Sequence, residues 1–243
     1  MRAIRACLVL LVAVASPATA ADSLTALQTG AACAVLPASA LPRNSVRIVG
    51  AQDVVQRHMY ARGDLVVIGA GTNRGLQRDQ RYYLRRGPVR TYGRSGPRGA
   101  ATTGWLRIVS ANEATAIGQV EFACDGISPG DSLAPFADPI LPPGAERADR
   151  DGQPAFAAAG RVLFGADERT SGAARDFLLV SFGAAGGIQP GAQLAIYREI
   201  NGGPLVAVGE AVVTAVHPDA SIVRVTLARD AVFSGDLVVP RRP

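Results

Sequence analysis

Residues 124–135 read CDGISPGDSLAP, and residues 229–240 read RDAVFSGDLVVP. Four positions of the first stretch recur 105 residues later in the second: Asp125, Gly130, Asp131 and Pro135 return as Asp230, Gly235, Asp236 and Pro240. A Gly-Asp pair is typical of a turn, because Gly accepts a positive φ and Asp bonds to nearby backbone. The recurrence predicts two similar halves, each ending in a turn and a short strand.

The chain upstream of each stretch also corresponds between the two halves. Residues 64–68 (DLVVI) and 176–180 (DFLLV) are apolar runs 112 residues apart, and each is followed by a glycine-rich turn and a second apolar run. From Gly104 onward the spacing is 105, so the first half carries seven extra residues. Residues 117–123 and 222–228 keep the same alternation of apolar and polar side chains, which indicates strands, since a one-residue shift would exchange their two faces.

These patterns predict an all-β protein of two tandem small antiparallel β-barrel or β-sandwich domains, with about six strands each. The first domain is expected at residues 46–135 and the second at residues 160–243. Residues 136–159 are Pro-rich and then charged, which is typical of a linker. Residues 21–45 show little regular period and are expected to form an N-terminal segment. Closure into a barrel is favoured because it removes exposed sheet edges.

The first twenty residues have the pattern of a secretory signal peptide. Arg2 and Arg5 precede an apolar run, and a small-residue Ala-Thr-Ala cleavage site ends at Ala20. The apolar run is shorter than the roughly 18 residues that a membrane anchor requires. We therefore expect a periplasmic or secreted protein without a transmembrane segment, whose mature chain begins at Ala21. Loss of the two arginines lowers the formal net charge from +5 to about +3.

Two cysteines remain after removal of the signal peptide, Cys33 and Cys124. In an oxidising compartment an even number of cysteines is most simply explained by a disulfide, which would tie the N-terminal segment to the first domain. Two free thiols and a redox pair are the alternatives. The sequence favours neither, because it has no Cys-x-x-Cys motif and no His beside either cysteine.

Motifs of catalysis and cofactor binding are not evident. The glycine-rich residues 69–75 follow a strand, but they lack the helix start and later acidic residue of a dinucleotide site, so a turn is expected. His58 and His217 occupy non-equivalent positions of the two halves, and no nucleophile or metal motif accompanies them. We therefore expect no enzymatic activity, metal or cofactor. Glycan hydrolysis by two carboxylates remains the enzymatic alternative.

An arginine-rich stretch at residues 74–98 stands out from the rest of the chain. It contains eight arginines and one acidic residue, and all 25 basic residues of the protein are Arg. Arginine with interleaved tyrosine suits anionic polymers, so this stretch is a candidate anion-binding loop, although a solvated surface loop is the simpler interpretation. The candidate residues are Arg81, Arg85, Arg86, Arg90, Tyr92, Arg94 and Arg98.

Several sequence segments resemble a known bacterial domain. The residues DLVVIGAGTNRGL (64–76), QRYYLRR (80–86) and ACDGISPGDSLAP (123–135), with their counterparts in the second half, are similar to the C-terminal β-domain of the flagellar assembly protein T. Similar domains accompany LysM modules in bacterial envelope proteins. The resemblance covers most of residues 46–135 and 160–240. It implies an exported, non-enzymatic module that supports an envelope assembly, present here as two copies.

The sequence therefore predicts a scaffold or binding module of the bacterial cell envelope. Support of an envelope, flagellar or secretion assembly is the role that the resemblance implies. Its expected partner is a cell-envelope protein or an anionic envelope polymer. Binding of peptidoglycan or lipopolysaccharide through the arginine-rich stretch is the alternative. Nucleic acid is not expected as a partner, because the net charge of the mature chain is only mildly basic.

Overall fold

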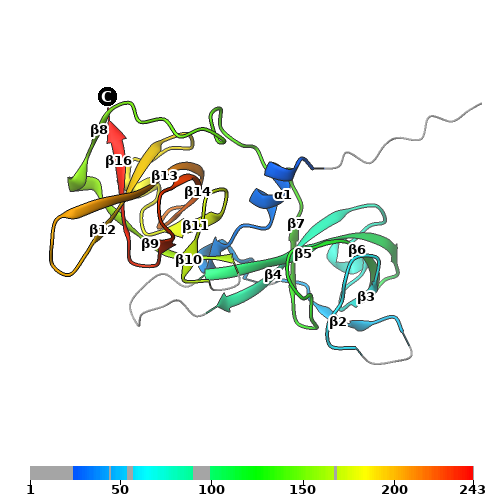
Figure 1. Ribbon diagram of the computed structural model, residues 1–243. Coiled ribbons are helices and arrows are strands. Elements are labelled where there is room, and N and C mark those ends of the chain that lie inside the picture. Colours follow the sequence, from blue (N-terminus) through cyan, green and yellow to red (C-terminus); the bar gives the residue numbers. More distant parts are fainter. Residues whose placement is uncertain (1–23, 44, 54–56, 90–98, 167–168, 243) are drawn as a thin grey trace, which may run out of the picture.

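Two β units lie side by side, with a short N-terminal helix between them (Figure 1). The computed structural model describes residues 24–43, 45–53, 57–89, 99–166 and 169–242. The predicted all-β fold class, with two small barrel-like or sandwich-like sheets, is confirmed. Within the described ranges, no helix has the length and apolar character needed to cross a membrane.

The first unit is a curled antiparallel sheet. Its strand order is β2-β3-β6-β5-β4-β7, and β1 (Leu36–Pro37) adds to β5. The sheet curls until its two ends meet. There the Gly130 N–H donates to the Ile48 carbonyl at 2.8 Å, and Arg47 and Ser132 form an isolated antiparallel β-bridge. The six strands are β2 (Ile48–Ala51), β3 (Leu65–Ile68), β4 (Arg81–Val89), β5 (Gly99–Ala111), β6 (Ala116–Ala123) and β7 (Ser132–Pro135).

The second unit is a closed six-stranded barrel in the order β12-β13-β14-β11-β9-β16, with β16 paired back to β12. Closure leaves the six strands without a free edge over their paired length. The strands are β9 (Gly160–Gly165), β11 (Phe177–Val180), β12 (Gln193–Glu199), β13 (Leu205–Val216), β14 (Ser221–Ala228) and β16 (Leu237–Arg242). The short strand β8 (Gln153–Pro154), within the predicted linker, extends this sheet by pairing with β16. Strands β10 (Ser171–Gly172) and β15 (Val232–Phe233) form a separate two-stranded sheet.

The alternation seen in the sequence places one face of each strand in a core. Val66 and Ile68 of β3 are fully buried, as are Val223 and Val225 of β14. Each sheet encloses its own apolar cluster, one around Leu84, the other around the two valines of β14. Burying these branched side chains removes apolar surface from water, which is the main stabilising term for each unit.

The glycine-rich turns take the same form in both units. Each begins with a short 3-10 helix, η2 (Thr72–Arg74) or η5 (Ala184–Gly186), and ends at a glycine of positive φ, Gly75 or Gly187. Only glycine takes this conformation without steric cost. The turn predicted for residues 69–75 is therefore confirmed. Two further 3-10 helices are η1 (Ala38–Ala40) and η3 (Phe156–Ala158).

The N-terminal segment contains a helix, α1 (Ala26–Ala32), that the sequence pattern did not predict. A capping box starts it: the Gln28 backbone N–H donates to the Thr25 hydroxyl, and the Thr25 N–H donates to the Gln28 side chain. Such reciprocal bonds satisfy N–H groups that the first turn of a helix leaves free. The helix has only seven residues, too few to show a clear apolar period.

This segment fills the space between the two units. Ala32 packs with Tyr83 and Trp105 on the outer face of the first sheet. Ala34 and Val35 are both buried against the second barrel. One short segment therefore contributes to two separate apolar clusters, and it joins the units through packing as well as through the chain.

Candidate functional site

Three of the seven candidate anion-binding residues lie on strand β4, and each has partners within the protein. Arg81 donates from Nε to Glu121 Oε2 at 2.7 Å, and Arg107 binds the other oxygen of the same carboxylate at 2.6 Å. The Arg81 guanidinium also lies 4.0 Å from the centre of the Phe136 ring. The positive charge of Arg81 is therefore stabilised by a carboxylate and by an aromatic face.

Arg85 is the most deeply buried of the three, at 9% exposure. Its guanidinium donates to the Thr102 hydroxyl and lies 4.2 Å from the centre of the Tyr83 ring. No carboxylate among the described residues contacts it. Burial without a counter-charge lowers the pKa of Arg85 to about 10, because the charged form loses its hydration.

Arg86 binds the aspartate of the Gly-Asp turn. Its Nε lies 2.8 Å and its Nη2 lies 2.9 Å from the two oxygens of Asp131, which is 2% exposed. The same carboxylate accepts hydrogen bonds from the Thr103 hydroxyl and from the Ser128 backbone N–H. This fork geometry is the strong, oriented form of an Arg–carboxylate pair, and it raises the pKa of Arg86.

The second barrel repeats this arrangement at the corresponding positions. Arg198, 112 residues after Arg86, binds both oxygens of Asp236 at 2.9 and 2.7 Å. Asp236 also accepts a hydrogen bond from the Phe233 backbone N–H at 2.7 Å. Arg198 reaches Asp230 at 3.0 Å, as Arg86 reaches Asp125 at 3.5 Å. The pKa of Arg198 is raised for the same reason as that of Arg86.

A second arginine completes each turn. Arg47 donates to the Gly130 carbonyl, and Arg161 donates to the Gly235 carbonyl, both at 2.7 Å. The sequence indicated the turn itself, but it did not identify the buried carboxylate as the partner of a distant arginine. A signal was present, because Arg86 and Arg198 align at the spacing of 112. These clusters hold the turns in place and close the sheets.

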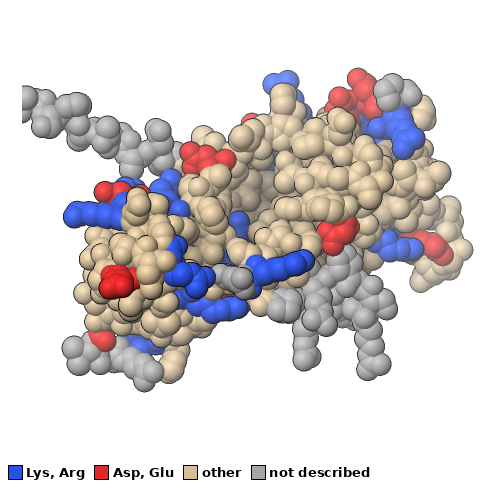
Figure 2. All heavy atoms as spheres, turned by 180° about the vertical axis from the view of Figure 1, so that it is seen from behind, with Lys and Arg blue, Asp and Glu red and all other residues tan. Residues whose placement is uncertain are grey.

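The remaining candidates, Arg90, Tyr92, Arg94 and Arg98, lie outside the described residues. Anion binding by residues 90–98 therefore stays a prediction from the sequence. Figure 2 shows basic side chains interspersed with acidic ones over the rear face, with more basic ones on the half formed by the first unit. The described arginines of β4 contribute mainly to packing and ion pairs within the protein.

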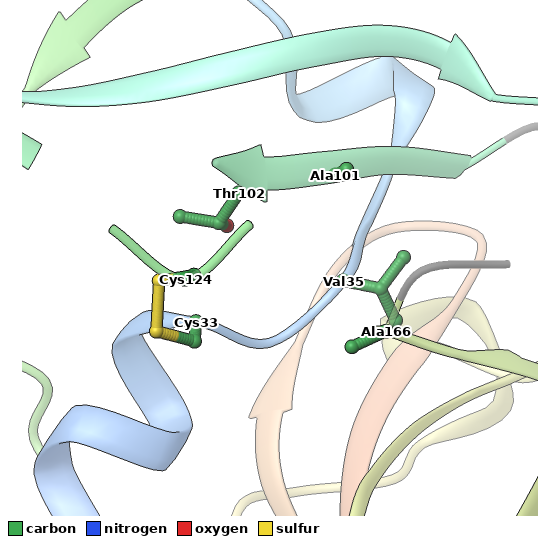
Figure 3. A pocket seen from close by; sticks show the side chains of 6 residues that line it. All are labelled: Cys33, Val35, Ala101, Thr102, Cys124 and Ala166. Atoms are coloured by element: carbon green, nitrogen blue, oxygen red, sulfur yellow. A yellow bond between two sulfur atoms is a disulfide. The ribbon is translucent and has the colours of Figure 1, made fainter. Parts of the chain in front are cut away.

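The predicted disulfide between Cys33 and Cys124 is present, with the two Cα atoms 5.6 Å apart. Figure 3 shows it beside a small cavity, with Thr102 and Ala101 of β5 above and Val35 opposite Ala166. This cavity measures about 40 Å³, which suits one or two water molecules rather than an organic ligand. It marks the place where the N-terminal segment and both β units meet.

The buried acids of the described chain are all neutralised by arginine. They are Asp131, Asp236 and Glu210, and Glu210 binds Arg241 at 3.2 Å. No cluster of three or more His, Cys, Asp or Glu residues that would suit a metal ion occurs in the part of the chain that the structure describes. His217 lies in the turn between β13 and β14, where burial lowers its pKa and Arg85 lowers it further, against an opposing effect of Asp219.

A search of protein-family models finds no match to this chain, and a search of curated proteins likewise finds none.

Proposed function

We propose that the protein is an exported, non-enzymatic scaffold or binding module of the bacterial cell envelope. One observation carries this proposal: the N-terminal segment packs into both β units and is tied to the first by the Cys33–Cys124 disulfide. Structural disulfides persist in oxidising compartments such as the periplasm. The signal-peptide pattern of residues 1–20 also supports export.

We further infer that the two β units are tandem copies of one module. The supporting feature is the Arg–Asp cluster, in which Arg86 and Asp131 of the first unit match Arg198 and Asp236 of the second. Gly130 and Gly235 have nearly identical φ values of +94° and +93° at this turn. Shared sequence, turn geometry and buried ion pair together favour duplication over chance.

The use of the charged residues supports a structural role. Acid–base catalysis needs a carboxylate with access to substrate and a suitably poised pKa. Asp131 and Asp236 are instead enclosed by arginine, backbone N–H groups and neighbouring side chains. Their carboxylates hold turns together, and two modules joined by packing and a disulfide suit a scaffold that presents its surfaces to partners.

Export and the disulfide are tested together on protein produced in a bacterial host with an envelope. We expect the protein in the periplasm or the medium, beginning at Ala21, with a mass about 2 Da below that of the dithiol form. Cys33 and Cys124 should resist alkylation until a reductant is added. Recovery in the cytosol with two reactive thiols would contradict the proposal that the protein is exported.

Binding is tested by co-sedimentation of the mature protein with purified sacculi and with outer-membrane fractions. We expect retention with at least one of them at low salt. A variant with Arg90, Arg94 and Arg98 changed to Ala separates the two kinds of partner. Loss of retention in that variant, and in wild type at high salt, indicates an anionic polymer, since salt screens exposed charges. Unchanged retention indicates a protein partner, and retention in neither fraction contradicts the binding role.

A further inference from the structure

A cavity of about 370 Å³ lies at one end of the second barrel. The turn between β11 and β12, the residues before β9 and the end of β16 form its wall. Its apolar surface includes Ala159, Phe182, Ile188, Ala192 and Pro240. A volume of this size falls at the lower end of the range for small-molecule sites, and the mouth of a β-barrel is a common place for one.

The residues around this cavity differ from their counterparts in the first unit. Ile188 is half-buried, whereas Leu76, its counterpart 112 residues earlier, is only 3% exposed in the core. Arg241 lines the cavity, whereas its counterpart Phe136 packs on Tyr83 with ring centres 4.5 Å apart. In the first unit both of these positions hold packed apolar side chains. In the second unit they hold a half-buried isoleucine and an arginine, and both of these residues line the cavity.

The rim carries an excess of positive charge. Arg241 and Arg150 both contact the single buried carboxylate of Glu210, at 3.2 and 3.6 Å. The neighbouring Arg242 is exposed and makes no ion pair with any residue in the described ranges. Arg150, Arg241 and Glu210 together carry a net charge of +1, and Arg242, which lines the cavity beside Arg241, adds a second positive charge.

Arg241 also retains an unused donor. Its Nη1 and Nη2 groups bind the Arg150 and Gly152 carbonyls and Glu210, but its buried Nε has no hydrogen-bond partner. A buried donor without an acceptor costs free energy. The positive charge of Arg242, which has no acidic partner among the described residues, favours an anionic group at the rim.

We propose that this cavity binds a small amphiphilic anion, with an apolar body of medium acyl length and a carboxylate. The apolar body lies against Phe182, Ile188 and Ala159, where it leaves water, and the carboxylate lies at the rim near Arg242 and Arg241. The mixture of an apolar wall with a few charged groups suits a ligand of this kind. The site does not depend on the scaffold role, since none of its lining residues belongs to the apolar clusters at the junction of the two units.

The test uses octanoate as the probe, titrated into the mature protein by calorimetry and by NMR chemical-shift mapping. Octanol and octyltrimethylammonium serve as neutral and cationic comparisons of the same chain length. We expect saturable octanoate binding, shifts at Ile188 and Gln189, and weaker binding of the other two. Octanol binding as tightly as octanoate would overturn the anionic part, and no saturable octanoate binding at millimolar concentration would overturn the site.

Three variants sharpen the result. Arg242→Gln should weaken octanoate binding about tenfold, equivalent to about 1.4 kcal/mol, the size of a hydrogen bond to a charged group. Arg229→Gln, which removes another exposed arginine, is the matched control and should bind as wild type does. Ala159→Trp should block the cavity, while a normal thermal unfolding curve shows that the barrel is intact. Equal affinity of the Arg242→Gln variant and wild type would contradict the proposal.

Discussion

Arg85 and Arg86 follow each other on β4 but have very different surroundings. The Arg86 guanidinium binds both oxygens of a buried carboxylate, whereas Arg85 is buried against a hydroxyl and an aromatic ring. Removing one member of a buried ion pair leaves the other unpaired, which is costly. Removing a buried charge without a partner carries no such penalty.

Substitution by Met separates these two cases at the residue level. Arg86→Met should lower the free energy of unfolding by about 3 kcal/mol, because it strands the Asp131 carboxylate. Arg85→Met should leave the free energy of unfolding unchanged or raise it, because Met keeps much of the apolar stem and removes the desolvated charge. Urea unfolding at pH 7 measures both. A loss at Arg85 as large as that at Arg86 would contradict this distinction between the two arginines.

His217 gives a residue-level prediction about pH. The pKa of His217 is lower in the folded protein than in the unfolded chain. Between these two pKa values the unfolded chain therefore binds more protons than the folded one. The stability that neutral His217 contributes is therefore complete above about pH 6.5 and falls as the pH drops toward the folded pKa. His217→Gln should lose less stability than wild type between pH 7.5 and about 5. Parallel stability curves for the two proteins would contradict this prediction.

At the scale of elements, α1 and the residues after it are too short to be stable alone. Isolated helices shorter than about 12 residues are marginal in water, and α1 has seven. Packing on both β units and the disulfide therefore supply most of its stability. The closed loop spans 91 residues, so the covalent link restricts a large part of the unfolded chain.

Removal of this link should weaken the protein without changing its fold. We expect the Cys33→Ser, Cys124→Ser double variant to lose about 4 kcal/mol in the free energy of unfolding, because its unfolded chain gains freedom. Urea unfolding of the double variant, of wild type and of reduced wild type measures the effect. Reduced wild type should match the double variant. Equal stability of oxidised and reduced wild type would rule out a stabilising disulfide.

Direct contact between the two units depends on a residue without a side chain. A Cβ added at Gly99, at the start of β5, would lie 2.0 Å from the ring of Phe164 on β9. Phe164 is itself 2% exposed, so its ring has little room to move. The close approach of the two units therefore requires glycine at this position.

Gly99→Ala should loosen the contact between the units. We expect a larger radius of gyration by small-angle X-ray scattering, with unchanged far-UV circular dichroism, because each unit keeps its own core. Gly50→Ala is the matched control, since nothing lies within 4 Å of the Cβ that it would add. Adding Phe164→Ala to the Gly99→Ala variant should restore part of the compact form. An unchanged radius in Gly99→Ala would show that the two units do not depend on this contact.

The strands were predictable because alternation and spacing are local and occur twice. Helix α1 was not, since its seven residues show no clear period, and only the Thr25 to Gln28 spacing indicates its start. The Arg86–Asp131 pair was hidden for a different reason. The seven extra residues of the first half lie between its members, so arginine and aspartate recur at different spacings, 112 and 105. The cavity of the second barrel depends on how Phe182 and Ile188 pack, which no local pattern records.

The position of the N-terminal segment sets an order of events during synthesis. Val35 is made early, but the surface that it covers on the second barrel, around Phe164 and Ile222, is made last. The junction needs residues from both ends of the chain, so it can form only after the second barrel has been made. Oxidation of Cys33 with Cys124 becomes possible once both residues reach an oxidising compartment, and the disulfide then holds the segment against the first unit. The covalent bond thus restricts the segment to the neighbourhood of the surface that Val35 covers on the second barrel.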